Sequence, residues 1–301
     1  MPTIKLPAPV MAFAVEPRSK GDEDKVFSAL RRLQEEDPTI DLHRDPQTGE
    51  QIVAGLSQMH VEVIVDRMRA RFGAEVTLKP PRVPYQETIR RSAKAHGRHK
   101  KQTGGRGQFG DCHIQIEPLP AGSGFEFADA IKGGVIPSGF IPAVEKGVQD
   151  AMQAGVVAGY PVKDVKVTVF DGSYHTVDSS EMAFRLAGAT AMREALEQAG
   201  SVLLEPIMLV TVSVPEDAVG DVIGDLNARR GHPHGMEPVG SGITEVKAEV
   251  PMAEMLSYAP DLRAITGGQG EFTMEFLRYE EVPSHLSEKV ISKARTEPVK
   301  V

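Results

Sequence analysis

One stretch of the sequence concentrates positive charge. Between Ile89 and Gly110 it holds no aspartate or glutamate, although the whole chain carries a net charge of -8. Its basic residues are Arg90, Arg91, Lys94, Arg98, Lys100, Lys101 and Arg106, with His96 and His99 among them. Cations gathered on an acidic protein can direct one face towards nucleic-acid phosphates while the rest is repelled. A solvated flexible loop would explain the charge equally well.

The same stretch ends in a glycine-rich segment. Residues 105–110 fit the pattern G-x-G-x-x-G, but a dinucleotide site needs a strand before the glycines and a helix after them. Here a basic segment comes first and a strand pattern follows. We therefore predict a hairpin tip composed of Gln102, Thr103, Gly104, Gly105, Arg106 and Gly107. Its glycines would let backbone N–H groups approach phosphates, and Arg106 could bind phosphate with its forked guanidinium.

A second candidate chemistry is hydrolysis, because His175, Asp178 and Ser179 lie close together in the sequence and are residue types that hydrolytic sites use. Such a site needs a nucleophile bonded to the histidine and an acid that orients the ring. The same residues fit the start of a helix, since Asp178 as N-cap with Glu181 three positions later resembles a capping box. We favour the helix start, preceded by a turn at residues 171–173.

Other polar patterns are weaker. His232-Pro233-His234 has no nearby cysteine or second histidine pair, so we predict a surface turn and no metal site. Arg229 and Arg230 end a predicted helix, where cations suit the helix dipole; they could equally contact RNA. No G-x-x-x-x-G-K-[ST] pattern occurs, so the chain has no P-loop.

Bulk composition limits the class of protein. With 301 residues and 41% hydrophobic content, the chain can form two or three small domains. It has no apolar run long enough to span a bilayer and no signal-peptide core. The single cysteine, Cys112, cannot form an internal disulfide, which fits a reducing cytoplasm. Because Cys112 alternates with Ile114 and Ile116, we predict that it is a core residue.

Apolar periodicity divides the chain into three blocks. Residues 1–80 and 202–301 each give the order βαββαβ, which predicts two ferredoxin-like sandwiches. In the first, Val26, Leu30 and Leu33 mark a helix that Asp37 and Pro38 end. Residues 81–201 predict an α/β domain with a long Ala-rich helix before Gly200. The last block ends in a short amphipathic helix at about residues 284–294, and the fold class is α+β.

Several long motifs, in order, resemble elongation factor G. They are residues 102–110, 133–137 (GGVIP), 171–181 (DGSYHTVDSSE), 204–208 (LEPIM) and 220–231 (GDVIGDLNARRG). The resemblance extends from about Leu6 to Leu286. It implies that family's domains III, IV and V, with a middle domain like domain 2 of ribosomal protein S5 and with the GTPase domain absent. The chain itself would then be no enzyme and bind no cofactor or metal, while GTP and Mg would bind the GTPase domain of the parent protein.

The resemblance also implies a role in translocation. Domain IV of the family enters the A site of the small ribosomal subunit, where its tip contacts the tRNA–mRNA duplex. Carried over, the contact residues are Gln102 to Gly107, with Arg98, Lys100 and Lys101 beside them, and Gly172, Ser173, Tyr174 and His175. The expected partners are the ribosome, through 16S and 23S rRNA, and the parent's GTPase domain. We expect a cytoplasmic monomer that does not bind membranes.

Two segments depart from the family pattern. The family often has Gly-Glu-Leu-His-Leu-Glu where this chain has residues 57–62 (SQMHVE), and a basic pattern is replaced by residues 266–271 (TGGQGE). These departures suggest a divergent paralogue. The alternative to an elongation role is a related module for ribosome recycling or rescue, and a third hypothesis is a stand-alone enzyme using His175 and Ser179.

Overall fold

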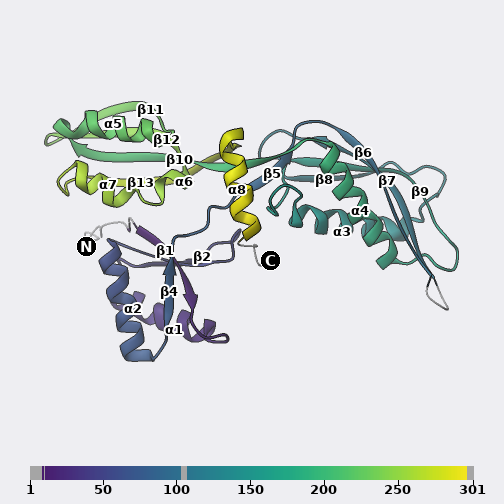
Figure 1. Cartoon of the computed structure of the whole chain (residues 1–301), viewed down its shortest axis with the longest axis horizontal. Coiled ribbons are helices and arrows are strands. Elements are labelled where there is room, and N and C mark those ends of the chain that lie inside the picture. Colours follow the sequence, from purple (N-terminus) through teal and green to yellow (C-terminus); the bar gives the residue numbers. More distant parts are fainter. Residues whose placement is uncertain (1–8, 10, 103–106, 297–301) are drawn as a thin grey trace, which may run out of the picture. The chain divides into compact units, whose positions relative to one another are not determined.

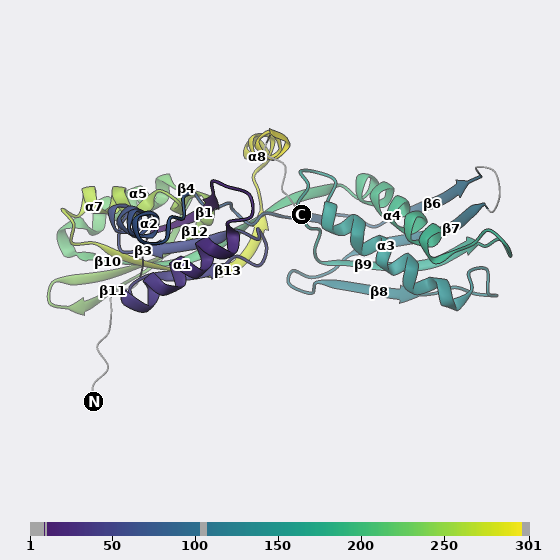
Figure 2. The same cartoon turned by 90° about the horizontal axis from the view of Figure 1, so that it is seen from below.

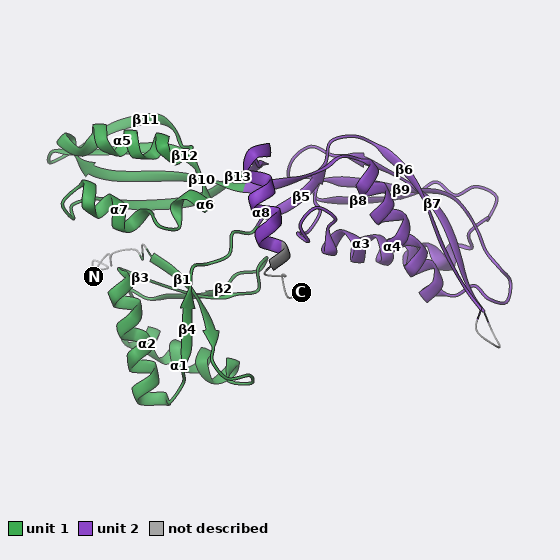
Figure 3. Cartoon of the chain, in the orientation of Figure 1, with its two compact units in different colours: residues 1–84, 206–278 green, residues 85–205, 279–301 purple. Residues whose placement is uncertain are grey.

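The chain divides into two compact units in the computed structural model, which describes residue 9, residues 11–102 and residues 107–296. Unit 1 comprises residues 1–84 and 206–278, and unit 2 comprises residues 85–205 and 279–301 (Figure 3). Strand β10 (Ser201–Pro215) contributes residues to both units, so the domain boundary that we expected after residue 201 falls inside a strand. In the described part of the chain, no helix is long and apolar enough to cross a membrane.

The N-terminal part of unit 1 forms the predicted βαββαβ sandwich. Its elements are β1 (Met11–Pro17), α1 (Glu23–Glu36), β2 (Asp41–Arg44), β3 (Gln51–Gly55), α2 (Gln58–Phe72) and β4 (Val76–Lys79) (Figure 1). The antiparallel sheet has the order β2-β3-β1-β4. Val26, Leu30 and Leu33 are buried against it, as their helical spacing predicts.

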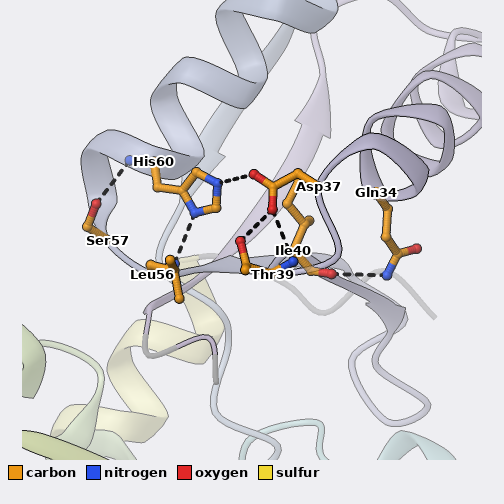
Figure 4. A network of polar contacts seen from close by, with 7 residues as sticks. All are labelled: Gln34, Asp37, Thr39, Ile40, Leu56, Ser57 and His60. Carbon is orange, nitrogen blue, oxygen red and sulfur yellow. Dashed lines mark hydrogen bonds and ion pairs between the residues drawn. The ribbon is translucent and has the colours of Figure 1, made fainter. Parts of the chain in front are cut away.

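A polar network joins the end of α1 to the start of α2 (Figure 4). His60 Nδ1 accepts from the backbone N–H of Leu56 at 3.1 Å, which leaves Nε2 to donate to Asp37 at 2.9 Å. A hydrogen bond from Thr39, followed by that from His60, holds the pKa of the Asp37 carboxyl below its ordinary value. Ser57 caps α2 by accepting from the His60 backbone N–H. The segment that departs from the family pattern is therefore tied into its own sandwich.

The second part of unit 1 repeats the βαββαβ order. Its elements are β10, η2 (Glu216–Ala218), α5 (Val219–Ala228), β11 (His232–Gly240), β12 (Ile243–Pro251), α6 (Met252–Met255), α7 (Tyr258–Ile265) and β13 (Glu271–Glu281). The sheet order is β11-β12-β10-β13. The turn predicted at His232-Pro233-His234 was wrong, since these residues begin strand β11. An edge strand tolerates proline because its N–H need not pair, and the register shifts after Pro233.

Unit 2 contains the α/β domain and the last helix. Its elements are β5 (Gln86–Ile89), β6 (Ala93–Lys101), β7 (Gln108–Pro118), β8 (Phe125–Asp129), η1 (Ser138–Phe140), α3 (Ile141–Ala154), β9 (Val165–Ser173), α4 (Glu181–Gln198) and α8 (Ser284–Thr296). The main sheet has the order β6-β7-β9-β8, and β5 pairs with β10. Figure 2 shows α3 and α4 side by side along this sheet. Helix α4 ends before Gly200, whose left-handed φ of 69° fits the predicted C′ position.

Helix α4 lies unusually close to strands β6 and β7. A Cβ atom added to Gly97 would lie 2.0 Å from the carbonyl oxygen of Ala187, and one added to Gly110 would lie 2.5 Å from that of Ala183. The side chains of the helix at this contact are alanines, which are fully buried. The Ala-rich composition of α4 therefore serves close packing as well as helix propensity.

Cys112 is fully buried in the core of unit 2, as its alternation with Ile114 and Ile116 predicts. Burial raises the pKa of its thiol from 9.0 to about 12, with the charge of Asp111 adding to the effect. Three pKa units correspond to roughly a thousandfold fewer thiolates near pH 8. We expect Ellman's reagent to modify Cys112 at least a hundredfold more slowly in native buffer than in urea. Equal rates would show that the thiol is accessible in the folded chain.

Candidate nucleic-acid interface

The basic stretch is a strand of a long hairpin. Strand β6 pairs with β7 from Ala93↔Ile116 to Lys101↔Gln108, so the two strands lead directly into the predicted tip. The solvated-loop interpretation is wrong for residues 93–101, because their N–H and C=O groups belong to a sheet. Of the predicted tip, Gln102 and Gly107 are described, and residues 103–106, with Gly104, Gly105 and Arg106 among them, lie outside the described residues.

Alternation along β6 separates two faces. Ala95 and Gly97 are buried towards the helices, whereas Lys94, His96 and Arg98 are exposed. Lys100 continues the exposed series, and Lys101 and Gln102 at the strand's end are exposed as well. The strand therefore holds the predicted cations in solvent and in a fixed register.

A second segment reaches the same end of the sheet through β9. The turn predicted at residues 171–173 was wrong, because β9 continues to Ser173, which lies opposite Asp111. A bulge between His113 and Ile114 admits one more residue and lets the pairing continue. Gly172 is required there, since a Cβ atom would lie 2.4 Å from the carbonyl oxygen of Asp111. The exposed side chains of Tyr174 and His175 follow directly.

His175 has a fixed ring orientation. Its Nδ1 accepts from the backbone N–H groups of Val177 at 3.3 Å and Asp178 at 3.1 Å. The proton of the neutral ring is therefore assigned to Nε2. Ser179 Oγ accepts from the backbone N–H of His175 and is not bonded to the ring. This geometry does not form the Ser–His pair of a hydrolase; it presents the imidazole of His175 as a hydrogen-bond donor.

Asp178 joins the two tip segments. The prediction of Asp178 as N-cap was wrong: α4 begins at Glu181, and Ser180 caps it by accepting from the N–H of Ala183. Asp178 Oδ1 instead accepts from the Gly107 N–H at 3.0 Å, and its carbonyl accepts from Phe109 at 2.9 Å. A carboxylate at this position could satisfy either local donors or donors across the tip. The nearby Ser180 takes the local role, which frees Asp178 for the longer contact.

Arg229 and Arg230 are held within their own domain. The guanidinium of Arg229 bonds to Asp225 at 2.8 Å and Asp261 at 2.5 Å, and its side chain is only 14% exposed. Arg230 pairs with Glu254 at 3.0 Å. These acids occupy the donors that an RNA phosphate would need, so we leave both arginines out of the interface.

Family models match three consecutive segments of the chain. The family models that match are elongation factor G domain III at residues 6–80, elongation factor G domain IV at residues 81–200 and elongation factor G C-terminus at residues 202–290. Among relatives, an elongation factor G-like protein of Thermotoga maritima is 52% identical over 97% of this chain and 43% of its own length. Elongation factor G of Aquifex pyrophilus is 55% identical over 96% of this chain and 41% of its own length.

A solved structure agrees in fold. A crystal structure of a protein from Thermus thermophilus superposes with a TM-score of 0.84 at 43% identity, covering 98% of this chain and 44% of that one. The chain thus spans less than half the length of these relatives. The fold and the matches together place the chain in one class, the C-terminal domains of elongation factors. It belongs to the elongation factor G family, whose domain III, domain IV and C-terminal domain it contains, and this confirms the resemblance seen in the motifs.

Proposed function

We propose that this chain is the ribosome-binding part of an elongation factor G-like protein that promotes GTP-dependent translocation of tRNA and mRNA. The observation that supports it is the tip of unit 2, where Asp178 bonds to Gly107 and so links the hairpin to the segment that carries His175. The linked tip holds exposed cations and a histidine donor together. These groups suit RNA, which proteins recognise through phosphates, 2′-hydroxyls and shape.

Within this proposal the tip enters the A site of the small ribosomal subunit. Lys100 and Lys101 neutralise phosphates, while Gln102 and His175 donate hydrogen bonds to the tRNA–mRNA duplex. The chain itself performs no catalysis. GTP and Mg bind a GTPase domain of the parent protein, and binding of this chain to 16S and 23S rRNA couples that domain to movement.

Removing the tip's charge tests the proposal. A plot of log affinity against log salt has a negative slope. The triple variant Lys100→Ala, Lys101→Ala and Arg106→Ala should make this slope less steep by roughly 2 to 3, because fewer counterions are released on binding. The measurement is the affinity of the full chain for purified 70S ribosomes at several salt concentrations.

A matched control removes the same charge elsewhere in unit 2. Lys146, Arg193 and Lys289 are exposed residues outside the hairpin. Their triple alanine variant should keep the original slope. If the tip variant and this control share one slope, the tip does not contact RNA and the proposal fails.

A further inference from the structure

The open face of the unit 2 sheet carries cations interleaved with flat rings. Lys94 Nζ lies 5.3 Å from the centre of the Phe170 ring, and Arg98 Cζ lies 5.5 Å from that of Phe109. Between these pairs, the rings of His96 and His113 stack at 4.1 Å with an angle of 5° between their planes. We define the sheet face as Lys94, His96, Arg98, Phe109, His113 and Phe170.

Its register is set by the strands. His96 lies directly opposite His113, and exposed residues two apart on β6 repeat at about 6.6 Å along the strand. Helices α3 and α4 do not cover this side, because the alternate residues Ala95 and Gly97 are the ones that face them. The sheet face is therefore a rigid surface that borders the tip.

Two carboxylates lie next to the sheet face. Asp111 has a side chain only 10% exposed and lies 3.1 Å from His96 Nε2 and 3.7 Å from Arg98 Nε. Asp171 lies opposite His113, and its side chain accepts from the N–H of Gly172 at 2.8 Å. Asp111 is engaged by His96 and Arg98, whereas Asp171 stays exposed beside the sheet face.

A metal ion is the other ligand that His96, Asp111 and His113 could bind, since their ligand atoms lie within 4.8 Å of one another. Two observations disfavour it. The stacked rings are parallel, so their in-plane nitrogen lone pairs do not converge on one point. Arg98 also competes for Asp111, and Lys94 adds a second positive charge on the same face.

We propose that the sheet face is a second RNA-contact surface, which adjoins the tip and shares Arg98 with it, and that it binds an RNA strand through phosphates and stacked bases. Lys94 and Arg98 contact phosphates, since Arg98 lies 3.7 Å from Asp111, beyond hydrogen-bond distance. The rings of Phe109, His113 and Phe170 offer stacking partners. Cations that alternate with aromatic rings are the arrangement by which proteins bind RNA strands without sequence preference. The proposal rests on the proposed ribosome-binding function and extends it beyond the tip.

The test separates the sheet face from the tip. The double variant Lys94→Gln and His96→Gln changes residues that we did not assign to the tip. Its affinity for 70S ribosomes should fall roughly 3- to 10-fold at low salt. Combined with the tip triple variant, the two losses should multiply, because independent contacts add in free energy. The matched control is Lys146→Gln with His285→Gln, which removes the same side-chain types from exposed helical positions.

Each outcome decides one claim. If the sheet-face variant binds like its control while the tip variant is weakened, this inference is overturned and the proposed function stands. If neither variant weakens binding, the proposed function fails as well. Zn²⁺ binding by the chain alone, lost in His96→Gln without any change in ribosome affinity, would assign these residues to a metal and overturn the RNA contact. Circular dichroism and melting curves establish that every variant is folded.

Discussion

Glu87→Ala is expected to lower the free energy of unfolding of unit 2 by about 3–5 kcal/mol. The side chain of Glu87 is fully buried. Its Oε2 accepts from the N–H groups of Val156 at 2.8 Å and Val157 at 3.0 Å. Its Oε1 accepts three more, from Ala158, Gly159 and Tyr160, at 2.9, 3.1 and 3.2 Å.

The physical reason is that the Glu87 carboxylate accepts hydrogen bonds from several backbone N–H groups at once, and alanine leaves all of them without this acceptor. A buried N–H group without a partner costs about 1–3 kcal/mol, and the loop after α3 has these groups directed at one carboxylate. Glu87→Gln keeps the side-chain volume but replaces one acceptor oxygen by an NH₂ group, which cannot accept from the loop N–H groups. We therefore expect this variant to be destabilised too. Rearrangement of the loop towards water limits the total below the sum of the separate costs.

Urea unfolding read out at Cys112 measures the effect. This residue is the chain's single cysteine and lies in the core of unit 2, so its labelling by Ellman's reagent reports the opening of that unit. Glu126→Ala is the control, because it removes an exposed carboxylate from strand β8 of the same domain. A midpoint for Glu87→Ala equal to that of the control would show that the buried carboxylate does not hold the loop.

Gly97→Ala is expected to destabilise unit 2 by about 2–3 kcal/mol or more, although it adds a single methyl group. The new Cβ would lie 2.0 Å from the carbonyl oxygen of Ala187 and 2.6 Å from the backbone nitrogen of Ala191. Both atoms belong to the backbone of α4, so no side chain can rotate away. The helix must shift away from the sheet, which disrupts its packing against β6 and β7.

Gly139→Ala is the matched control for this substitution. It lies in the same unit, and a Cβ atom there would meet nothing within 4 Å. The same Cys112 labelling in urea compares the two variants with the parent chain. We expect the control to unfold at the parent's midpoint and Gly97→Ala to unfold at lower urea. Coincident midpoints would mean that α4 adjusts to the extra methyl group without loss.

Local pattern alone identified most elements. The spacing of Val26, Leu30 and Leu33 predicted helix α1, and the alternation around Cys112 predicted a buried strand. These features are encoded by neighbours within a few residues, so one-dimensional periodicity reveals them. Errors arose where glycine or proline was taken as a turn, at residues 171–173 and at Pro233. A bulge and an edge position let those strands continue.

The candidate site was only partly predictable. The charge of residues 90–106 and the position of His175 are visible in the sequence, and the resemblance to elongation factor G gave them a role. The contact between Asp178 and Gly107 joins residues 71 positions apart, and no local signal distinguishes it from a helix cap. Arg229 shows the converse, because only the structure reveals Asp261 beside a cation that could have met RNA.

By itself, the sequence determined the order of the elements, the charged hairpin and the family to which the chain belongs. Tertiary structure decided which polar groups are free to meet a partner and which are held inside. In the folded chain, the carboxylate of Glu87 accepts from a loop, α4 packs directly against Gly97, and His96 lies opposite His113. The physical reason is that a periodic pattern depends on neighbouring residues, whereas hydrogen-bond partners and close backbone contacts depend on segments that only folding brings together.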